Sequence, residues 1–157
     1  MFRLGIKMLD AIEVMHDAAL VHRDVKPHNF CLSKTDPNHV VMMDMGLAKK
    51  FRRGNYQHVT YRDGRKMTGT VRYTSINVHN GIEATRRDDV EGLVYVLLYF
   101  ALSRLPWQGI NIKDRDERYN AIGEMKRSTS PEKLCHGLPA EFVSMLNYCR
   151  SLSFSDK

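Results

Sequence analysis

The sequence lacks any apolar run long enough to cross a membrane. Its longest run, residues 94–102, is less than half as long as a membrane helix, which needs about 20 residues. The first residues open into an amphipathic pattern without a signal peptide, and no internal repeat or low-complexity tract follows. With 157 residues, of which 43% are hydrophobic, we expect one globular domain with a core, in the cytoplasm or the nucleus.

Cysteine is scarce, and its positions form no pattern. The three cysteines, Cys31, Cys135 and Cys149, are odd in number and show no metal-ligand spacing. This usage argues against a disulfide scaffold and against a zinc site. It predicts reduced thiols in a cytosolic or nuclear protein.

Positive charge is in excess, and the excess is local. The net charge is +6, from 24 Lys and Arg against 18 Asp and Glu. Basic residues cluster at 49–53 and 62–66, where they would attract acidic or phosphorylated substrates. The alternative is a solvated charged loop. Nucleic-acid binding is not expected, because no recognition motif accompanies the charge.

The most informative stretch is residues 22–29, which read H-R-D-V-K-P-H-N, with Asp44-Met45-Gly46 following. This spacing resembles the catalytic loop and the metal loop of protein kinases. Phosphoryl transfer needs a base at the attacking hydroxyl, cations at the phosphates and metal ligands in fixed relation. We therefore expect Asp24 to accept the hydroxyl proton and Lys26 to lie beside the transferring phosphoryl group. Asn29 and Asp44 would hold Mg²⁺.

The spacing of apolar residues predicts a mainly α-helical chain with one small β-hairpin. Short apolar runs on each side of a turn-forming segment predict a hairpin from 30–32 and 40–43, which would bring Asn29 and Asp44 together. Residues 46–68 have no periodicity and predict a long functional loop. Helical segments are expected at 4–20, 88–102, 114–126 and 139–152, and the Ser130-Pro131 pair predicts another helix start.

Residues 68–77 read T-G-T-V-R-Y-T-S-I-N, so Ser75-Ile76-Asn77 stands where most kinases have Ala-Pro-Glu. This resembles the casein kinase I family, which carries Ser-Ile-Asn there. The likeness continues through R-R-D-D-V-E, L-P-W-Q-G, E-R-Y and C-R-S-L, at 86–91, 105–109, 117–119 and 149–152. The sequence is identified as a member of that family, with tau-tubulin kinases or vaccinia-related kinases as the alternative.

The resemblance implies roles for residues around the first motif. Thr70 is similar to the threonine that hydrogen-bonds the catalytic aspartate and lysine and favours serine or threonine substrates. Asp89 resembles the helix aspartate that binds the backbone of the catalytic loop. His22 is expected in the core column that supports the metal loop. Arg23 often pairs in kinases with a phosphorylated residue of the loop that follows.

The resemblance also implies a substrate class and cofactors. The family acts on proteins that are acidic or already phosphorylated upstream of the target residue, with ATP and Mg²⁺. Its anion site corresponds here to Arg72, Gln108, Gly109 and Arg118.

The sequence departs from the kinase pattern in several places. It contains no G-x-G-x-x-G loop and no strand lysine with a paired helix glutamate, the parts that kinases use to bind ATP. We therefore expect residues 1–157 to be a partial kinase domain, the C-terminal lobe only, truncated at both ends. Met45 replaces a phenylalanine, and we expect it to fill the same core slot.

Two functions remain open at this point. The first is an active serine/threonine kinase of which this chain is a fragment, inactive by itself. The second is a catalytically inactive kinase-like binding module that docks phosphorylated or acidic segments on Arg72 and Arg118. The sequence leaves the oligomeric state, the substrate and the regulation open.

Overall fold

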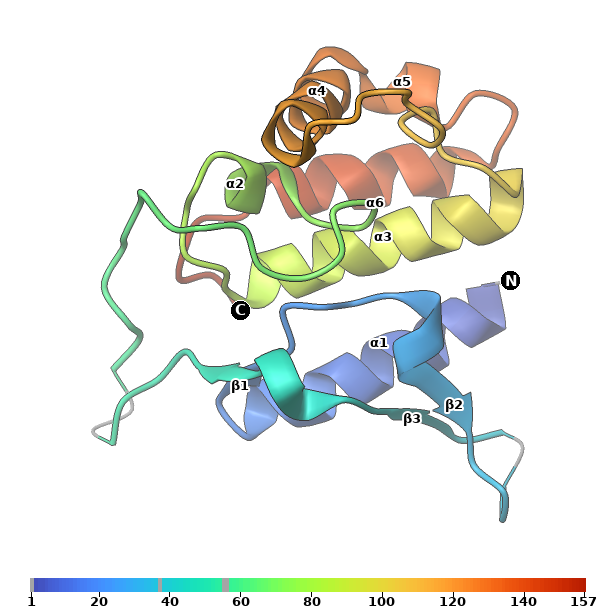
Figure 1. The fold of residues 1–157 in the computed structure, drawn as a ribbon. Coiled ribbons are helices and arrows are strands. Elements are labelled where there is room, and N and C mark those ends of the chain that lie inside the picture. The colour runs from blue at the N-terminus through green and yellow to red at the C-terminus, as the bar shows by residue number, and fades with distance from the viewer. Residues whose placement is uncertain (1, 37, 55–56) are drawn as a thin grey trace.

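The computed structural model describes residues 2–36, 38–54 and 57–157, and helices make up most of its regular structure (Figure 1). The helices are α1 (Phe2–Asp17), α2 (Ile76–His79), α3 (Arg86–Leu102), α4 (Arg115–Ser128), α5 (Pro131–Leu134) and α6 (Ala140–Ser151). The strands are β1 (Leu20–Val21), β2 (Phe30–Leu32), β3 (Val40–Met42) and β4 (Lys49–Lys50). The prediction of a mainly helical chain with a small hairpin is confirmed.

Helix α3 forms the centre of the fold. It lies between α1 on one side and α6 on the other, with α4 and α5 beyond α6 (Figure 1). Its middle, from Leu93 to Leu98, is buried on every side. A helix that is apolar all round is stable only inside a protein, and each such side chain contributes about 1.5–3 kcal/mol when fully buried. The buried side of α1 contributes Met8 and Ile12 to this core.

Two small antiparallel sheets lie beside α1. In the predicted hairpin, β2 and β3 pair with Phe30 opposite Met42 and Leu32 opposite Val40. The other sheet pairs Leu20 of β1 with Lys50 of β4. Sequence reasoning missed this second sheet and helix α2, because strands of two residues and a helix of four are too short to show a hydrophobic period.

The start of α3 differs from the prediction by two residues. The helix begins at Arg86, after a capping box in which Thr85 and Asp88 bond reciprocally. Arg86 and Arg87 donate to the carbonyls of Ser155 and Leu152, so the end of the chain covers this first turn. The apolar pattern begins later than the helix because the helix opens with two arginines, whose side chains make polar contacts instead of apolar ones. None of the described helices has the length and apolar character needed to span a membrane.

Candidate active site

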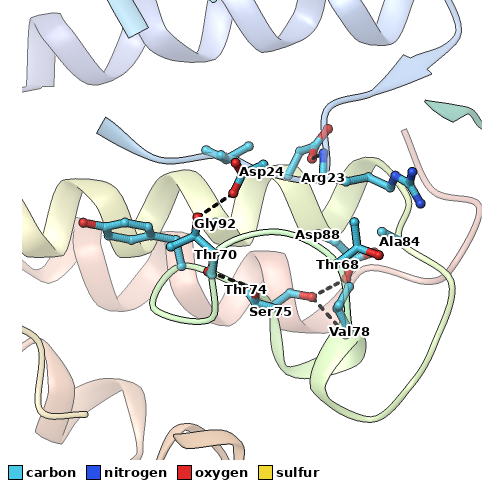
Figure 2. Close-up of a pocket in the computed structure, with 13 residues that line it drawn as sticks. Arg23, Asp24, Thr68, Thr70, Thr74, Ser75, Val78, Ala84, Asp88 and Gly92 are labelled. Carbon is cyan, nitrogen blue, oxygen red and sulfur yellow. Dashed lines mark hydrogen bonds between the residues drawn. The ribbon is translucent and has the colours of Figure 1, made fainter. Parts of the chain in front are cut away.

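Asp24 lies at the centre of a group of polar contacts in the loop after β1. The Thr70 hydroxyl donates to its Oδ1 over 2.7 Å, as Figure 2 shows, and the Lys26 ammonium donates to its Oδ2 over 2.5 Å. The side chain is buried, with 7% of the residue exposed. Burial would raise the pKa of Asp24, but the hydrogen bonds from Lys26 and Thr70 and the Lys26 charge outweigh it. The pKa therefore lies below its usual value of 3.8.

Asp89 on α3 holds the backbone of this loop. Its carboxylate accepts from the amide of His22 over 2.7 Å and from the amide of Arg23 over 2.9 Å. Arg23 has a φ of +68°, an unusual conformation for a residue with a side chain. Asp89 also bonds His16 on α1, 2.9 Å from its Nε2. Sequence reasoning missed His16, because this histidine lies within a helix and belongs to no recognisable motif.

The His22 ring connects the loop to the segment before Asp44. Its Nδ1 accepts from the Asp24 amide over 3.2 Å, so its Nε2 carries the hydrogen and donates to the Met43 carbonyl, 3.0 Å away. His22 is completely buried. The ring therefore supports Asp24 and Asp44 from the interior side.

Asn29 precedes β2 and Asp44 follows β3, so both lie at the open end of the β2–β3 hairpin. The Met43 amide donates to the Asn29 carbonyl over 2.8 Å, which extends the hairpin and brings Asp44 next to Asn29. Asn29 donates its amide hydrogens to the Asp24 carbonyl over 2.9 Å, so its side-chain oxygen is the atom left to bind a metal. Asp44 is exposed, and its side chain accepts from the Gly46 amide over 3.3 Å.

The donor chemistry of these two side chains suits Mg²⁺. The ion prefers oxygen ligands and binds through one or two protein groups together with phosphates and water. Among the described residues there is no group of three or more His, Cys, Asp or Glu that could hold a metal ion. The pair therefore fits an ion shared with a phosphate better than an ion held by protein ligands alone.

The expectation that Met45 fills a core slot is wrong. Met45 is 45% exposed. It lies in a short 3₁₀ turn, Met45–Leu47, that begins immediately after Asp44 and has no buried residue. The turn exposes the apolar side chains of Met45 and Leu47, and Met43, which precedes Asp44, is exposed as well.

Gly69 allows the later loop to approach the loop of Asp24. Its φ is +89°, and a Cβ built on it would lie 2.2 Å from the Arg23 carbonyl oxygen. Only glycine fits there without movement of the backbone. This close approach places the next residue, Thr70, within hydrogen-bond distance of Asp24.

Glu83 is a buried acidic residue that sequence reasoning missed. It accepts from Lys49 over 2.9 Å and from Arg65 over 2.8 Å, and the Arg23 guanidinium lies 3.9 Å away. Burial would raise the pKa of Glu83, but the bonds and charges of Lys49 and Arg65 hold it below its usual value of 4.5. Part of the basic excess in this loop is therefore neutralised by the protein itself.

The four residues expected to form an anion site do not all line one groove. Arg118 lines a groove of about 790 Å³ between α4 and the segment containing Gly69, together with Lys66 and Arg115. Sequence reasoning did not assign Lys66 or Arg115 to the site, although Lys66 belongs to the basic cluster at 62–66.

The other three residues make different contacts. The Arg72 guanidinium lies over the rings of Tyr73 and Tyr99, at 5.8 and 5.7 Å. Gln108 accepts from the Leu105 amide over 2.7 Å, so its side chain closes its own turn. Gly109 follows with a φ of +77°. Among the described residues that line the groove, Arg118 is the one member of the predicted set.

A comparison with known families agrees with this geometry. The family model for the protein kinase domain matches residues 3–153. The matched range contains the Asp24 loop, the hairpin with Asn29 and Asp44, the segment of Thr70 and the groove beside α4. The chain therefore belongs to the protein kinase domain family.

Proposed function

We propose that the chain carries the catalytic residues of a serine/threonine protein kinase of the casein kinase I type. It would transfer the γ-phosphoryl group of ATP to acidic or pre-phosphorylated proteins in the cytoplasm or nucleus. The observation that carries this proposal is the Asp24 carboxylate, held between the Thr70 hydroxyl and the Lys26 ammonium.

Each of these residues has a chemical task. With its lowered pKa, Asp24 is ionised at neutral pH and can accept the hydrogen bond and then the proton of a substrate hydroxyl. Lys26 lies close enough to Asp24 to place a positive charge beside the phosphoryl group during its transfer. Thr70 fixes the other carboxylate oxygen. Because the transition state of phosphoryl transfer is loose, fixed positions and charges account for most of the catalysis.

Asn29 and Asp44 would hold Mg²⁺, which neutralises phosphate charge when it is bound. The sequence contains no G-x-G-x-x-G loop. We propose that the glycine-rich loop and strand lysine with which kinases bind ATP lie outside these 157 residues. The isolated chain would then transfer phosphate poorly.

The groove beside α4 supports the proposed substrate class. Its lining includes the cationic side chains of Lys66, Arg115 and Arg118 and one acidic side chain, Asp116, so cations are in excess, and we call it the basic groove. Isolated exposed charge pairs are worth only about 0–1 kcal/mol, whereas charge-assisted hydrogen bonds reach about 1.5–3 kcal/mol each. A phosphate that several of these side chains bind together would therefore be selected over a single carboxylate.

The test measures phosphate transfer to an acidic peptide, with and without an upstream phosphoserine. The enzyme is a kinase domain that includes the proposed ATP-binding parts, and it is compared with its Asp24→Asn variant. We expect kcat to fall by about 10²–10⁴-fold, the usual contribution of a general base. Asp10→Asn, an exposed aspartate on α1, is the matched control and should leave kcat unchanged. Undiminished transfer by the Asp24→Asn protein would contradict the proposal.

The basic groove also favours a second candidate, a module that binds phosphorylated or acidic segments without catalysis. This function would be supported if the chain binds a phosphopeptide, measured by fluorescence anisotropy, and transfers no phosphate with Mg²⁺ and ATP present. Loss of that binding in the Arg118→Ala variant would assign it to the groove.

A further inference from the structure

Lys126 of α4 is buried in an unusual way. The residue has 0% exposure. Its ammonium donates to the Val71 carbonyl over 2.8 Å and to the Thr74 carbonyl over 2.6 Å, and it lies 3.3 Å from His79 Nε2. An ammonium has three hydrogens, and these contacts provide one acceptor for each. Lysine is almost never fully buried unless it is paired, and here the partners are backbone carbonyls and an imidazole.

Aromatic rings form the walls around this ammonium. The nitrogen lies 4.9 Å from the ring centre of Tyr95 and 5.1 Å from that of Trp107. Both distances are within the range of cation–π attraction. Trp107 also donates its ring N–H to the Arg72 carbonyl over 2.8 Å. Lys126 of α4 therefore holds the carbonyls of Val71 and Thr74, and Trp107, which precedes α4, holds the Arg72 carbonyl between them.

Among the described residues, Lys126 bonds carbonyls and an imidazole, and no carboxylate lies within ion-pair distance of its ammonium. Burial lowers the pKa of Lys126 to about 7, the nearby Glu91 carboxylate opposes this shift, and Arg150 adds to it. Glu91 itself accepts from the Tyr95 hydroxyl over 2.6 Å and from the Ile76 amide over 3.2 Å. Desolvation of the ammonium is costly, so the carbonyl bonds must offset it.

The segment that Lys126 holds is part of the site. We call residues 69–74 the substrate loop, because Gly69 and Val71 line the basic groove and Thr70 bonds Asp24. Within the loop, the Tyr73 amide and the Thr74 hydroxyl donate to the Thr70 carbonyl, over 2.9 and 3.0 Å. A shift of the Val71 or Thr74 carbonyl would therefore move Thr70 as well.

We propose that Lys126 is a positioning residue that fixes the substrate loop from behind, so that Thr70 stays on Asp24 and Val71 stays in the wall of the groove. Lys126 touches neither site directly and acts through the loop. Its effect on phosphate transfer rests on the proposed kinase function, whereas its effect on the order of the loop does not.

The experiment compares Lys126→Met, which keeps the apolar stem and removes the hydrogen donors, with Lys133→Met, an exposed lysine on α5. Backbone amide exchange of residues 70–75 is measured by mass spectrometry. Lys126→Met should exchange about 10-fold to 100-fold faster than the wild type, the equivalent of one lost charge-assisted hydrogen bond. Lys133→Met should match the wild type. A folded Lys126→Met protein with unchanged exchange would overturn the proposal.

Steady-state kinetics of the kinase domain provide a second test of the role of Lys126. In Lys126→Met we expect kcat/KM for the acceptor peptide to fall by about 10-fold to 100-fold, because small misplacements of reacting groups are costly. The KM for ATP should stay within about twofold, since ATP does not contact the loop in this proposal. A rise in the KM for ATP as large as the loss in kcat/KM for the peptide would contradict a role specific to the substrate loop. If the wild type transfers no phosphate while exchange still rises in Lys126→Met, the kinase function fails and the loop-holding role stands.

A measurement on the unchanged protein covers the case in which Lys126→Met does not fold. Low-dose acetylation with acetic anhydride, mapped by mass spectrometry, should modify exposed Lys113 and Lys133 long before Lys126. Acetylation of Lys126 at the rate of Lys133 would show that the Lys126 side chain is exposed to solvent, and the proposal would be wrong.

Discussion

The Thr70 hydroxyl donates a 2.7 Å hydrogen bond to Oδ1 of Asp24, across 46 residues of sequence. This bond joins the loop that carries the proposed base to the loop that lines the basic groove. It occupies one oxygen of the carboxylate, while Lys26 occupies the other. The position of the base thus depends on a residue from a distant part of the chain.

Replacing Thr70 by valine keeps the shape of the side chain and removes the hydroxyl. We expect kcat for peptide phosphorylation to fall by about 10-fold to 100-fold, because a hydrogen bond to a charged group is worth about 1.5–3 kcal/mol. Thr70→Ser, which retains the hydroxyl, should lose much less. Equal activity of the valine and serine variants, measured in the kinase domain, would show that this bond does not position Asp24.

Replacing Glu83 by glutamine should destabilise the protein in a pH-dependent way. Because the folded pKa of Glu83 lies below 4.5, the stability from its carboxylate is fully present above pH 4.5 and is lost as the pH falls through the folded pKa. At pH 7 we expect the free energy of unfolding to drop by about 1–3 kcal/mol, the cost of disturbing a buried polar group.

Urea unfolding between pH 3 and 8 measures this effect. The difference between wild type and Glu83→Gln should shrink as the pH falls below 4.5. Glu124→Gln removes an exposed pair with Arg127 and should change stability by less than about 1 kcal/mol at any pH. A difference for Glu83→Gln that does not vary with pH would argue against an ionic role.

Replacing Gly69 by alanine tests the close approach of the two loops. Gly137 is the control, because its φ of +79° is similar but a Cβ there would meet nothing within 4 Å. Gly137→Ala should cost about 1–2 kcal/mol from backbone strain alone. Gly69→Ala should cost more and also lower activity, since its Cβ would displace the Arg23 carbonyl. Equal losses of stability in the Gly69→Ala and Gly137→Ala proteins, measured by thermal unfolding, would mean that the close approach of the two loops does not contribute to stability.

Replacing Asp44 by asparagine should affect metal use without affecting the fold. Asp44 is exposed, and its contact with the Gly46 amide is long, at 3.3 Å, so stability should change by less than about 0.5 kcal/mol. In the kinase domain, the Mg²⁺ concentration needed for half-maximal activity should rise strongly, because the variant loses a carboxylate ligand. An unchanged Mg²⁺ dependence would remove Asp44 from the metal site.

Sequence alone predicted that several residues of the candidate site lie close together along the chain. Asp24, Lys26 and Asn29 lie within one loop, and the apolar runs of the hairpin predicted that Asp44 would come next to Asn29. Local spacing carries this information because a short loop and a hairpin leave the chain few ways to arrange these side chains. The long helices were predictable for a similar reason, since apolar residues recur with the helical period.

The tertiary structure decided the contacts between distant residues. Nothing in their local sequence shows that Glu83 meets Lys49 and Arg65, or that Lys126 turns inward while Lys133 remains exposed. The surface position of Met45 also depends on the turn that contains it. The identity of a charged residue in the sequence does not show whether it lies in solvent or in the core. Its role is set by which carbonyls, carboxylates and rings the packing of the helices brings within a few ångströms of it.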